Sequence, residues 1–120
     1  MHPLYEMATE VVDRLRAARL EVAHLSVELA QVEYGLRVAQ ARVERGLIKK
    51  VGGEKALAPT VEDRARIFVL ALDADQDYGE QLRRRDELEK SLEEARVEVA
   101  SLRDKLNVML AAMRATEGES

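Results

Sequence analysis

The stretch VGGEKALAPTVEDRARIFVLAL, residues 51–72, separates two long runs of helical sequence. Gly52 and Gly53 follow a run that ends in two lysines, and both glycine and basic residues are typical of a helix C-terminus. Pro59 disfavours the helical conformation for Ala58, so one helix cannot continue through this stretch. The stretch therefore predicts a hairpin rather than a single rod.

The sequence after Pro59 restarts a helix and then becomes apolar. Residues 60–63, TVED, have the T-x-x-D pattern of a helix N-terminus. Residues 67–72, IFVLAL, have the composition of a short strand or of a helix. We expect a helix, because a cap precedes the run and the sequence offers no second strand to pair with it. Such an apolar helix should be buried on several sides, by the end of the bundle or by a second subunit. Asp73, with Gln76 three residues later, is the expected N-cap of the next helix.

Both long runs carry apolar residues at alternating spacings of three and four, which is the pattern of a coiled-coil seam. The seam of the first run is uninterrupted and consists of Leu4, Ala8, Val11, Leu15, Ala18, Val22, Leu25, Leu29, Val32, Leu36, Ala39 and Val43. The seam of the second run consists of Leu88, Leu92, Ala95, Val99, Leu102, Leu106, Met109 and Met113. Upstream, Tyr78 and Leu82 fit the pattern only with a phase slip around residues 83–85.

Further apolar residues lie outside the seams, and a broad apolar surface requires more than one neighbouring helix. They include Leu20, Val27, Tyr34 and Ala41 on the first run and Val97, Val108 and Leu110 on the second. We therefore expect antiparallel pairing within the chain and further pairing with a second copy, most simply as a homodimer with a four-helix core. The residues expected to contact a second copy or a protein partner are Ile67, Phe68, Leu70, Leu20, Val27 and Tyr34.

The resulting prediction is an all-α protein with a single helical-hairpin domain over residues 1–120. We expect a helix at about 4–50, a turn at 51–60, a short buried helix at about 61–73, a helix at about 75–115 and a frayed tail at 116–120. Charged residues make up 35% of the chain and aromatic residues 3%, which suits long helices better than a sheet.

The composition also bears on partners and location. The net charge of −4 provides no global basic field, and the absence of Cys excludes disulfides and thiolate sites. No apolar run approaches the ~20 residues of a membrane span, and the N-terminus lacks the features of a signal peptide. We expect a cytoplasmic protein that does not enter a membrane.

The sequence contains no convergent set of catalytic residues, so we expect no enzyme activity, no cofactor, no metal and no small-molecule substrate. Asp73, Asp75 and Asp77 match the first half of a calcium loop. However, Tyr78 occupies the position of the required Gly, and Arg84 occupies that of the bidentate acid. We interpret the three aspartates as capping and turn residues.

Basic residues gather on both sides of the predicted turn, where a hairpin would bring them to one tip. They are Arg42, Arg45, Lys49, Lys50, Lys55, Arg83, Arg84 and Arg85. Such a tip could contact nucleic-acid phosphates. The competing interpretation is that these residues complement helix C-termini and form part of a solvated surface, since Asp86 and Glu87 lie close by and no aromatic residues are interleaved for base stacking.

Residues 56–78, ALAPTVEDRARIFVLALDADQDY, followed by a charged helix that contains VASLRDKLNVMLAAM, resemble small phage and prophage helical-hairpin proteins that are mostly uncharacterised. Residues 57–60 correspond to their Leu-Gly-Pro-Asn-like turn and residues 75–78 to their Asp-Pro-Glu-Tyr-like restart, with departures at Ala58 and Gln76. The resemblance covers about the second half of the chain and rests on caps and turns. It implies a phage or prophage origin, with a place near recombination or DNA-metabolism genes, and no catalytic residue.

The function that we expect is therefore a non-enzymatic structural or adaptor coiled coil, which oligomerises and presents a rigid surface to a protein partner. The alternative is an accessory nucleic-acid-binding protein that contacts phosphates through the basic tip.

Overall fold

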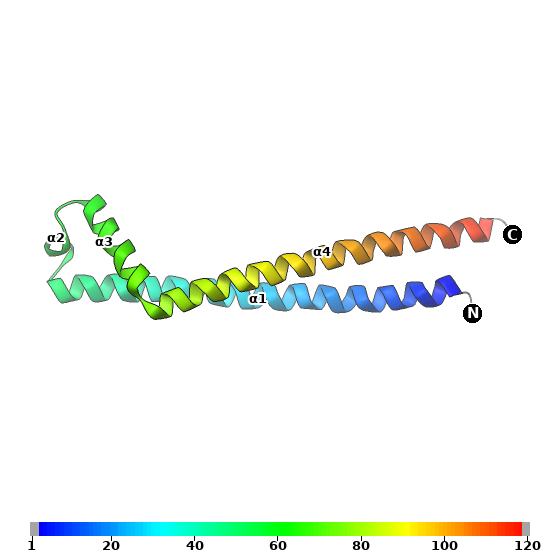
Figure 1. Cartoon of the computed structure of the whole chain (residues 1–120), viewed down its shortest axis with the longest axis horizontal. Helices are drawn as coiled ribbons and strands as arrows, with labels where there is room; N and C mark the ends of the chain where they lie inside the picture. The colour runs from blue at the N-terminus through cyan, green and yellow to red at the C-terminus, as the bar shows by residue number, and fades with distance from the viewer. Residues whose placement is uncertain (1–2, 119–120) are drawn as a thin grey trace. The chain divides into compact units, whose positions relative to one another are not determined.

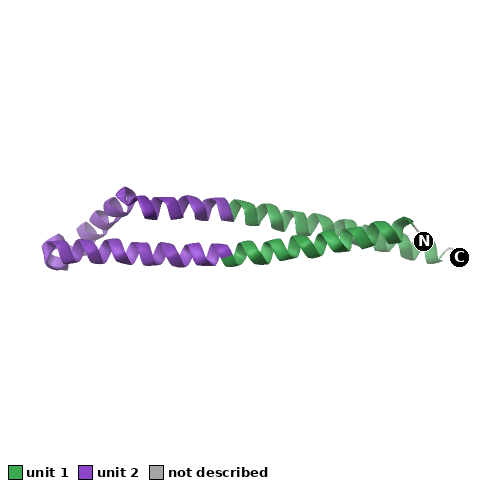
Figure 2. Ribbon diagram, turned by 90° about the horizontal axis from the view of Figure 1, so that it is seen from below, with its two compact units in different colours: residues 1–27, 89–120 green, residues 28–88 purple. Residues whose placement is uncertain are grey.

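The computed structural model describes residues 3–118, and every regular element in that range is a helix. α1 spans Pro3–Val51, α2 spans Glu54–Leu57, α3 spans Val61–Ala74 and α4 spans Gln76–Gly118 (Figure 1). The predicted all-α helical hairpin is confirmed, and residues 67–72 are helical as expected. The chain forms two compact units: unit 1 is Met1–Val27 with Glu89–Ser120, and unit 2 is Glu28–Leu88 (Figure 2).

The turn between the long helices contains more structure than the sequence indicated. Gly52 and Gly53 have φ angles of 90° and 134°, a region that glycine enters without a Cβ clash, and both backbone N–H groups donate to the carbonyl of Ile48. The single-turn helix α2 follows immediately. It ends at Leu57, and its C-cap Ala58 is extended before Pro59 as expected.

The helix that follows begins and ends at capped residues. The Thr60 hydroxyl accepts a hydrogen bond from Asp63 N–H at 3.1 Å, which confirms the predicted N-terminus of α3. The N-cap of α4 is Asp75 and not Asp73, because Asp75 Oδ2 accepts from Tyr78 N–H at 2.9 Å. At the other end α4 continues to Gly118, so the predicted frayed tail is wrong for residues 116–118. Residues 119–120 lie outside the described residues.

Unit 1 is a pair of antiparallel helix segments with an apolar core. Its buried cluster joins residues from the first part of α1 to residues from the last part of α4. The cluster consists of Ala8, Val11, Leu15, Leu102 and Met109. Arg14 on α1 also pairs with Glu98 on α4, with 3.4 Å between Nη2 and Oε1. All of these residues except Arg14 and Glu98 belong to the predicted seams, so hydrophobic spacing alone located this core.

Unit 2 also joins α1 to α4, but polar side chains occupy part of the contact. Tyr78, Gln81 and Arg85 are half-buried and Leu88 is buried, and these four residues continue the three–four spacing of the downstream seam. The predicted phase slip is therefore wrong. The sequence pattern missed this continuity because Gln81 and Arg85 are not apolar.

A glycine accommodates one of these polar residues. A Cβ on Gly35 of α1 would collide with the side-chain amide of Gln81. Gly35 therefore lets Gln81 lie directly against the backbone of α1.

α3 lies near the turn, as predicted, but a single chain covers only part of it. Leu72 is its one buried residue, and Ile67 and Phe68 are half-buried. Val61, Val69 and Leu70 are exposed. Within one chain α3 is thus amphipathic rather than buried on several sides. Burial of its outer face by a second copy stays a prediction.

Candidate functional site

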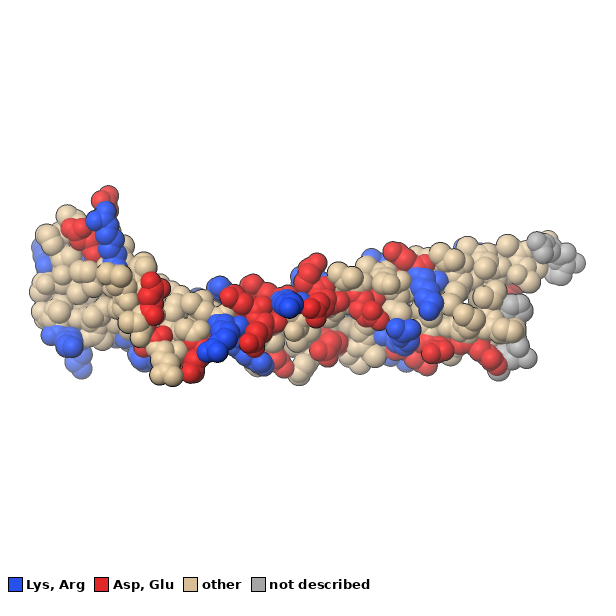
Figure 3. Space-filling view, in the orientation of Figure 1, with Lys and Arg blue, Asp and Glu red and all other residues tan. Residues whose placement is uncertain are grey.

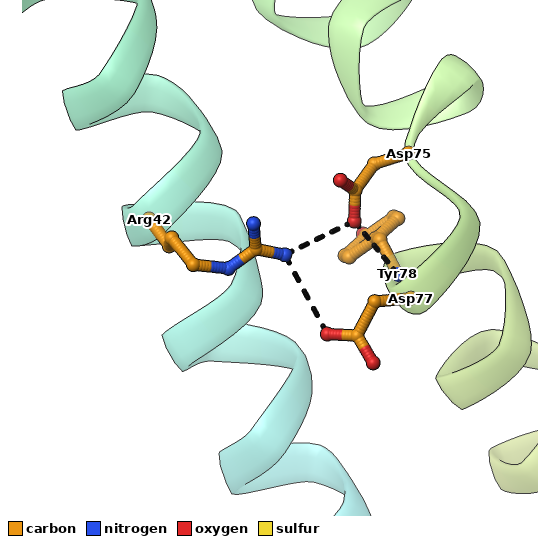
Figure 4. Close-up of polar contacts among 4 residues, drawn as sticks. All are labelled: Arg42, Asp75, Asp77 and Tyr78. Carbon is orange, nitrogen blue, oxygen red and sulfur yellow. Dashed lines mark hydrogen bonds and ion pairs between the residues drawn. The ribbon is translucent and has the colours of Figure 1, made fainter.

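Arg42 is a basic residue of the predicted tip that forms ion pairs with two carboxylates. Its Nη2 atom donates to Asp75 Oδ2 at 3.2 Å and lies 3.5 Å from Asp77 Oδ2 (Figure 4). Asp75 Oδ2 also caps α4 through Tyr78 N–H, so one carboxylate holds both the helix start and the guanidinium. Arg42 therefore links α1 to the beginning of α4, and the carboxylates of Asp75 and Asp77 compensate its positive charge.

Two of the arginines predicted for the tip also have acidic neighbours. Arg84 Nη2 donates to Glu28 Oε2 at 3.1 Å, which ties α4 to α1. Arg85 is half-buried in the seam and donates to Asp86 Oδ1 at 3.3 Å. These contacts fit the competing interpretation from the sequence, in which the acids near residues 83–85 neutralise the arginines.

The remaining basic residues of the predicted tip form no ion pair with an acidic residue among residues 3–118. They are Arg45, Lys49, Lys50, Lys55 and Arg83. Arg45 and Lys49 line one hollow of about 460 Å³ on α1, together with Arg42 and Gly46. This hollow is a basic concave surface of unit 2.

The structure does not gather all eight basic residues at one point. Arg84 contacts Glu28 on α1, whereas Lys49 lies 21 residues further along the same helix, on the order of 30 Å away. The reason is that α3 intervenes after the turn, so α4 begins opposite Arg42 rather than at the end of α1. On the face shown in Figure 3, carboxylates gather along α4 and the basic residues form separate small patches.

The apolar residues predicted for an interface remain largely exposed in a single chain. The exposed fractions are 66% for Leu20, 58% for Val27, 63% for Tyr34 and 69% for Leu70, and Ile67 and Phe68 are half-buried. Leu20 and Val27 belong to unit 1 and the others to unit 2. Single exposed apolar residues are normal on a protein surface. Leu20, Val27 and Tyr34 recur on α1 at a spacing of seven residues, so they lie along one side of the helix.

Unit 1 carries a groove that the sequence analysis did not single out. It consists of two adjoining hollows between α1 and α4, of about 270 Å³ and about 470 Å³, which share Val12 and Leu106. We call it the unit 1 groove. Its narrower end is lined by Tyr5 and Leu110, and its wider end by Leu20 and the three arginines Arg16, Arg19 and Arg103.

The sequence held a weak signal for the unit 1 groove. Val12 and Leu110 are apolar residues beside the seam, and Arg16 and Arg19 are neighbours on a helix surface because they are three residues apart. The contribution of Arg103 could not be foreseen, because the register of α4 against α1 decides which arginine of the second helix faces the first.

The described chain gives no indication of a metal centre or a membrane span. No group of three or more His, Cys, Asp or Glu residues within 3–118 could hold a metal ion. None of the helices described is both long enough and apolar enough to cross a membrane. Comparison of the chain with known protein families, curated proteins and solved structures finds no match. The resemblance to phage helical-hairpin proteins therefore rests on the residues quoted for it alone.

Proposed function

We propose that this protein is a non-enzymatic structural or adaptor coiled coil, which self-associates and binds a protein partner through apolar helix faces. The observation that carries the proposal is the exposure of the large apolar residues outside the seams, such as Tyr34 and Leu70. The packing between α1 and α4 leaves most of the surface of these residues exposed in the single chain. Burial against another helix would remove their apolar surface from water.

The test is the mass of the particle in solution. We expect size-exclusion chromatography with light scattering to show at least a dimer, and the double variant Tyr34→Ser with Leu70→Ser to shift it toward one chain. Both residues are exposed in unit 2, so the variant should remain helical by circular dichroism. Val51→Ser is the matched control, because Val51 is an exposed apolar residue of unit 2 that is not among the residues expected to pair with a second copy. A wild-type protein that stays a single chain at all concentrations would contradict the self-association.

One observation favours the alternative function, which is contact with nucleic-acid phosphates. Arg45 and Lys49 line the same hollow, and neither has an acidic partner among the described residues. This alternative predicts oligonucleotide binding that weakens steeply as salt rises and that is lost in Arg45→Glu with Lys49→Glu. Fluorescence anisotropy with labelled single-stranded and double-stranded oligonucleotides measures it. Absence of binding at low salt would remove the alternative.

A further inference from the structure

The unit 1 groove combines an apolar floor with an uncompensated positive end. Val12 and Leu106 lie in both hollows, and Tyr5 and Leu110 extend the apolar lining toward the narrower end. The lining on α1 runs from Tyr5 to Leu20, which corresponds to ~22 Å along a helix. A groove of this length and lining matches the apolar stripe of a helix of about four turns.

The wider end of the unit 1 groove is positively charged. Arg16, Arg19 and Arg103 line it, and no carboxylate lines either hollow. Nearby Arg14 is paired with Glu98, but these three arginines form no hydrogen bond or ion pair with any residue in 3–118. Three uncompensated guanidinium groups thus converge on one hollow of a protein whose net charge is −4. A bound carboxylate would find several donors there.

A second copy of this chain does not complement the groove through the same surface. Two grooves placed together in the same direction would bring the arginines of one copy against those of the other. Placed in opposite directions, each set of arginines would face the end lined by Tyr5 and Leu110, which also lacks a carboxylate in its lining. Either arrangement covers guanidinium groups without an acidic partner, and that costs free energy.

We infer that the unit 1 groove binds an amphipathic helix of a partner protein, which carries an apolar stripe and carboxylates at one end. The stripe lies on Val12, Leu106 and Leu110. The carboxylates pair with the three arginines and thereby set the direction in which the helix binds. This inference rests on the proposed adaptor function, because it names the partner and the surface that the adaptor uses.

The test uses two synthetic peptides of about 15 residues with the same helical leucine stripe. One peptide carries three glutamates at one end, and the other carries three lysines at the same positions. Titration of the full chain into each fluorescein-labelled peptide, followed by anisotropy, should give at least about tenfold tighter binding of the glutamate peptide. The triple variant Arg16→Glu, Arg19→Glu and Arg103→Glu should reverse that preference. Reversal is a gain of binding to the lysine peptide, which a merely misfolded variant would not show.

Two further variants serve as comparisons. One changes a surface charge away from the groove, and the other changes an apolar residue of the groove. Arg114→Glu changes an exposed arginine of α4 that does not line the groove, so the preference for the glutamate peptide should be unchanged. Val12→Ser should weaken binding of the glutamate peptide severalfold, because Val12 lies in both hollows.

Three outcomes would overturn the inference. The first is equal binding of the two peptides, and the second is no saturable binding of either peptide up to millimolar concentration. The third is conversion of a wild-type dimer to a single chain by Val12→Ser, since a second copy would then fill the groove. The inference can fail while the adaptor function survives, because the mass measurement on Tyr34→Ser with Leu70→Ser concerns residues of unit 2 and not the groove.

Discussion

The two units join the same pair of helices by different means. In unit 1 the contact is an apolar seam, with Leu15, Leu102 and Met109 among its buried residues. In unit 2 buried Leu36 and Leu88 share the contact with half-buried Gln81 and Arg85. Ion pairs from Glu28 to Arg84 and from Arg42 to Asp75 flank it. The same heptad spacing thus gives an apolar core in unit 1 and, in unit 2, a contact that apolar and polar side chains share.

The difference has a consequence for how each unit specifies its register. An apolar seam tolerates a shift of one heptad, because leucine packs against leucine in either alignment. The ion pairs that flank the contact in unit 2 discriminate more strongly, since a shift would separate Arg84 from Glu28 and Arg42 from Asp75. Our hypothesis is that unit 2 fixes the register of α4 on α1 and that unit 1 supplies most of the stability. Three pairs of variants test this comparison.

The largest effect should come from truncating matched leucines in the two units. Leu102 in unit 1 and Leu88 in unit 2 are both 4% exposed, so their burial is the same. We expect Leu102→Ala to lower the free energy of unfolding by about 3 kcal/mol, and Leu88→Ala to lower it by less. One neighbour of Leu88 in the seam is the half-buried Arg85, whose long side chain can relax into the space. Urea unfolding followed by circular dichroism measures both, and an equal or larger loss for Leu88→Ala would contradict the contrast between the units.

An intermediate effect should come from Asp75, which combines a cap with an ion pair. Asp75→Ala removes the acceptor for Tyr78 N–H and the contact with Arg42, and we expect a loss of about 1–2 kcal/mol. Asp75→Asn keeps a good N-cap and removes only charge, so the loss should be below about 1 kcal/mol. Arg42 is 56% exposed at its side chain and retains Asp77 as a partner. Equal losses in the two variants would show that the ion pair, and not the cap, is the main contribution.

The smallest effect should come from two glycines inside α1. A Cβ on Gly46 meets nothing within 4 Å, so Gly46→Ala should raise the free energy of unfolding by about 0.5–1 kcal/mol. Gly35→Ala should give a smaller gain or none, because the new Cβ displaces the amide of Gln81. Thermal unfolding of both variants provides the comparison. Equal gains in the free energy of unfolding would mean that Gln81 moves away without cost. The contact between Gln81 and Gly35 would then not help to fix the register of α4 on α1.

Much of the fold could be predicted from local chemistry and spacing. The seam residues of unit 1 are buried or half-buried as expected, and Gly52, Pro59 and Thr60 end and start helices where their backbone preferences require it. The predictions that failed depend on contacts between helices. Asp73 and Asp75 have similar capping propensity, and only the hydrogen bond to Tyr78 N–H distinguishes them. The continuity of the seam through Gln81 was hidden because burial of a polar side chain depends on what faces it.

The features of the candidate site also fall into those that follow from local sequence and those that depend on contacts between helices. Exposure of Leu20, Val27, Tyr34 and Leu70 follows from their positions outside the seams, and the surface that they form for a partner stays a prediction. The basic tip could not be resolved from the sequence, since the pairing of Arg42 and Arg84 with carboxylates and the separation of Arg84 from Lys49 both follow from where α4 begins. The cluster of Arg16, Arg19 and Arg103 became visible only once α4 lay against α1.

Residue order alone thus specified two long helices, the break between them and the apolar faces that join them, because backbone preference and hydrophobic spacing act over a few neighbouring residues. The tertiary structure decided the register of α4 on α1, the sharing of the seam by Gln81 and Arg85, and the set of arginines that meet in the unit 1 groove. Those features depend on residues far apart in the chain, whose side chains come together only after the helices have packed.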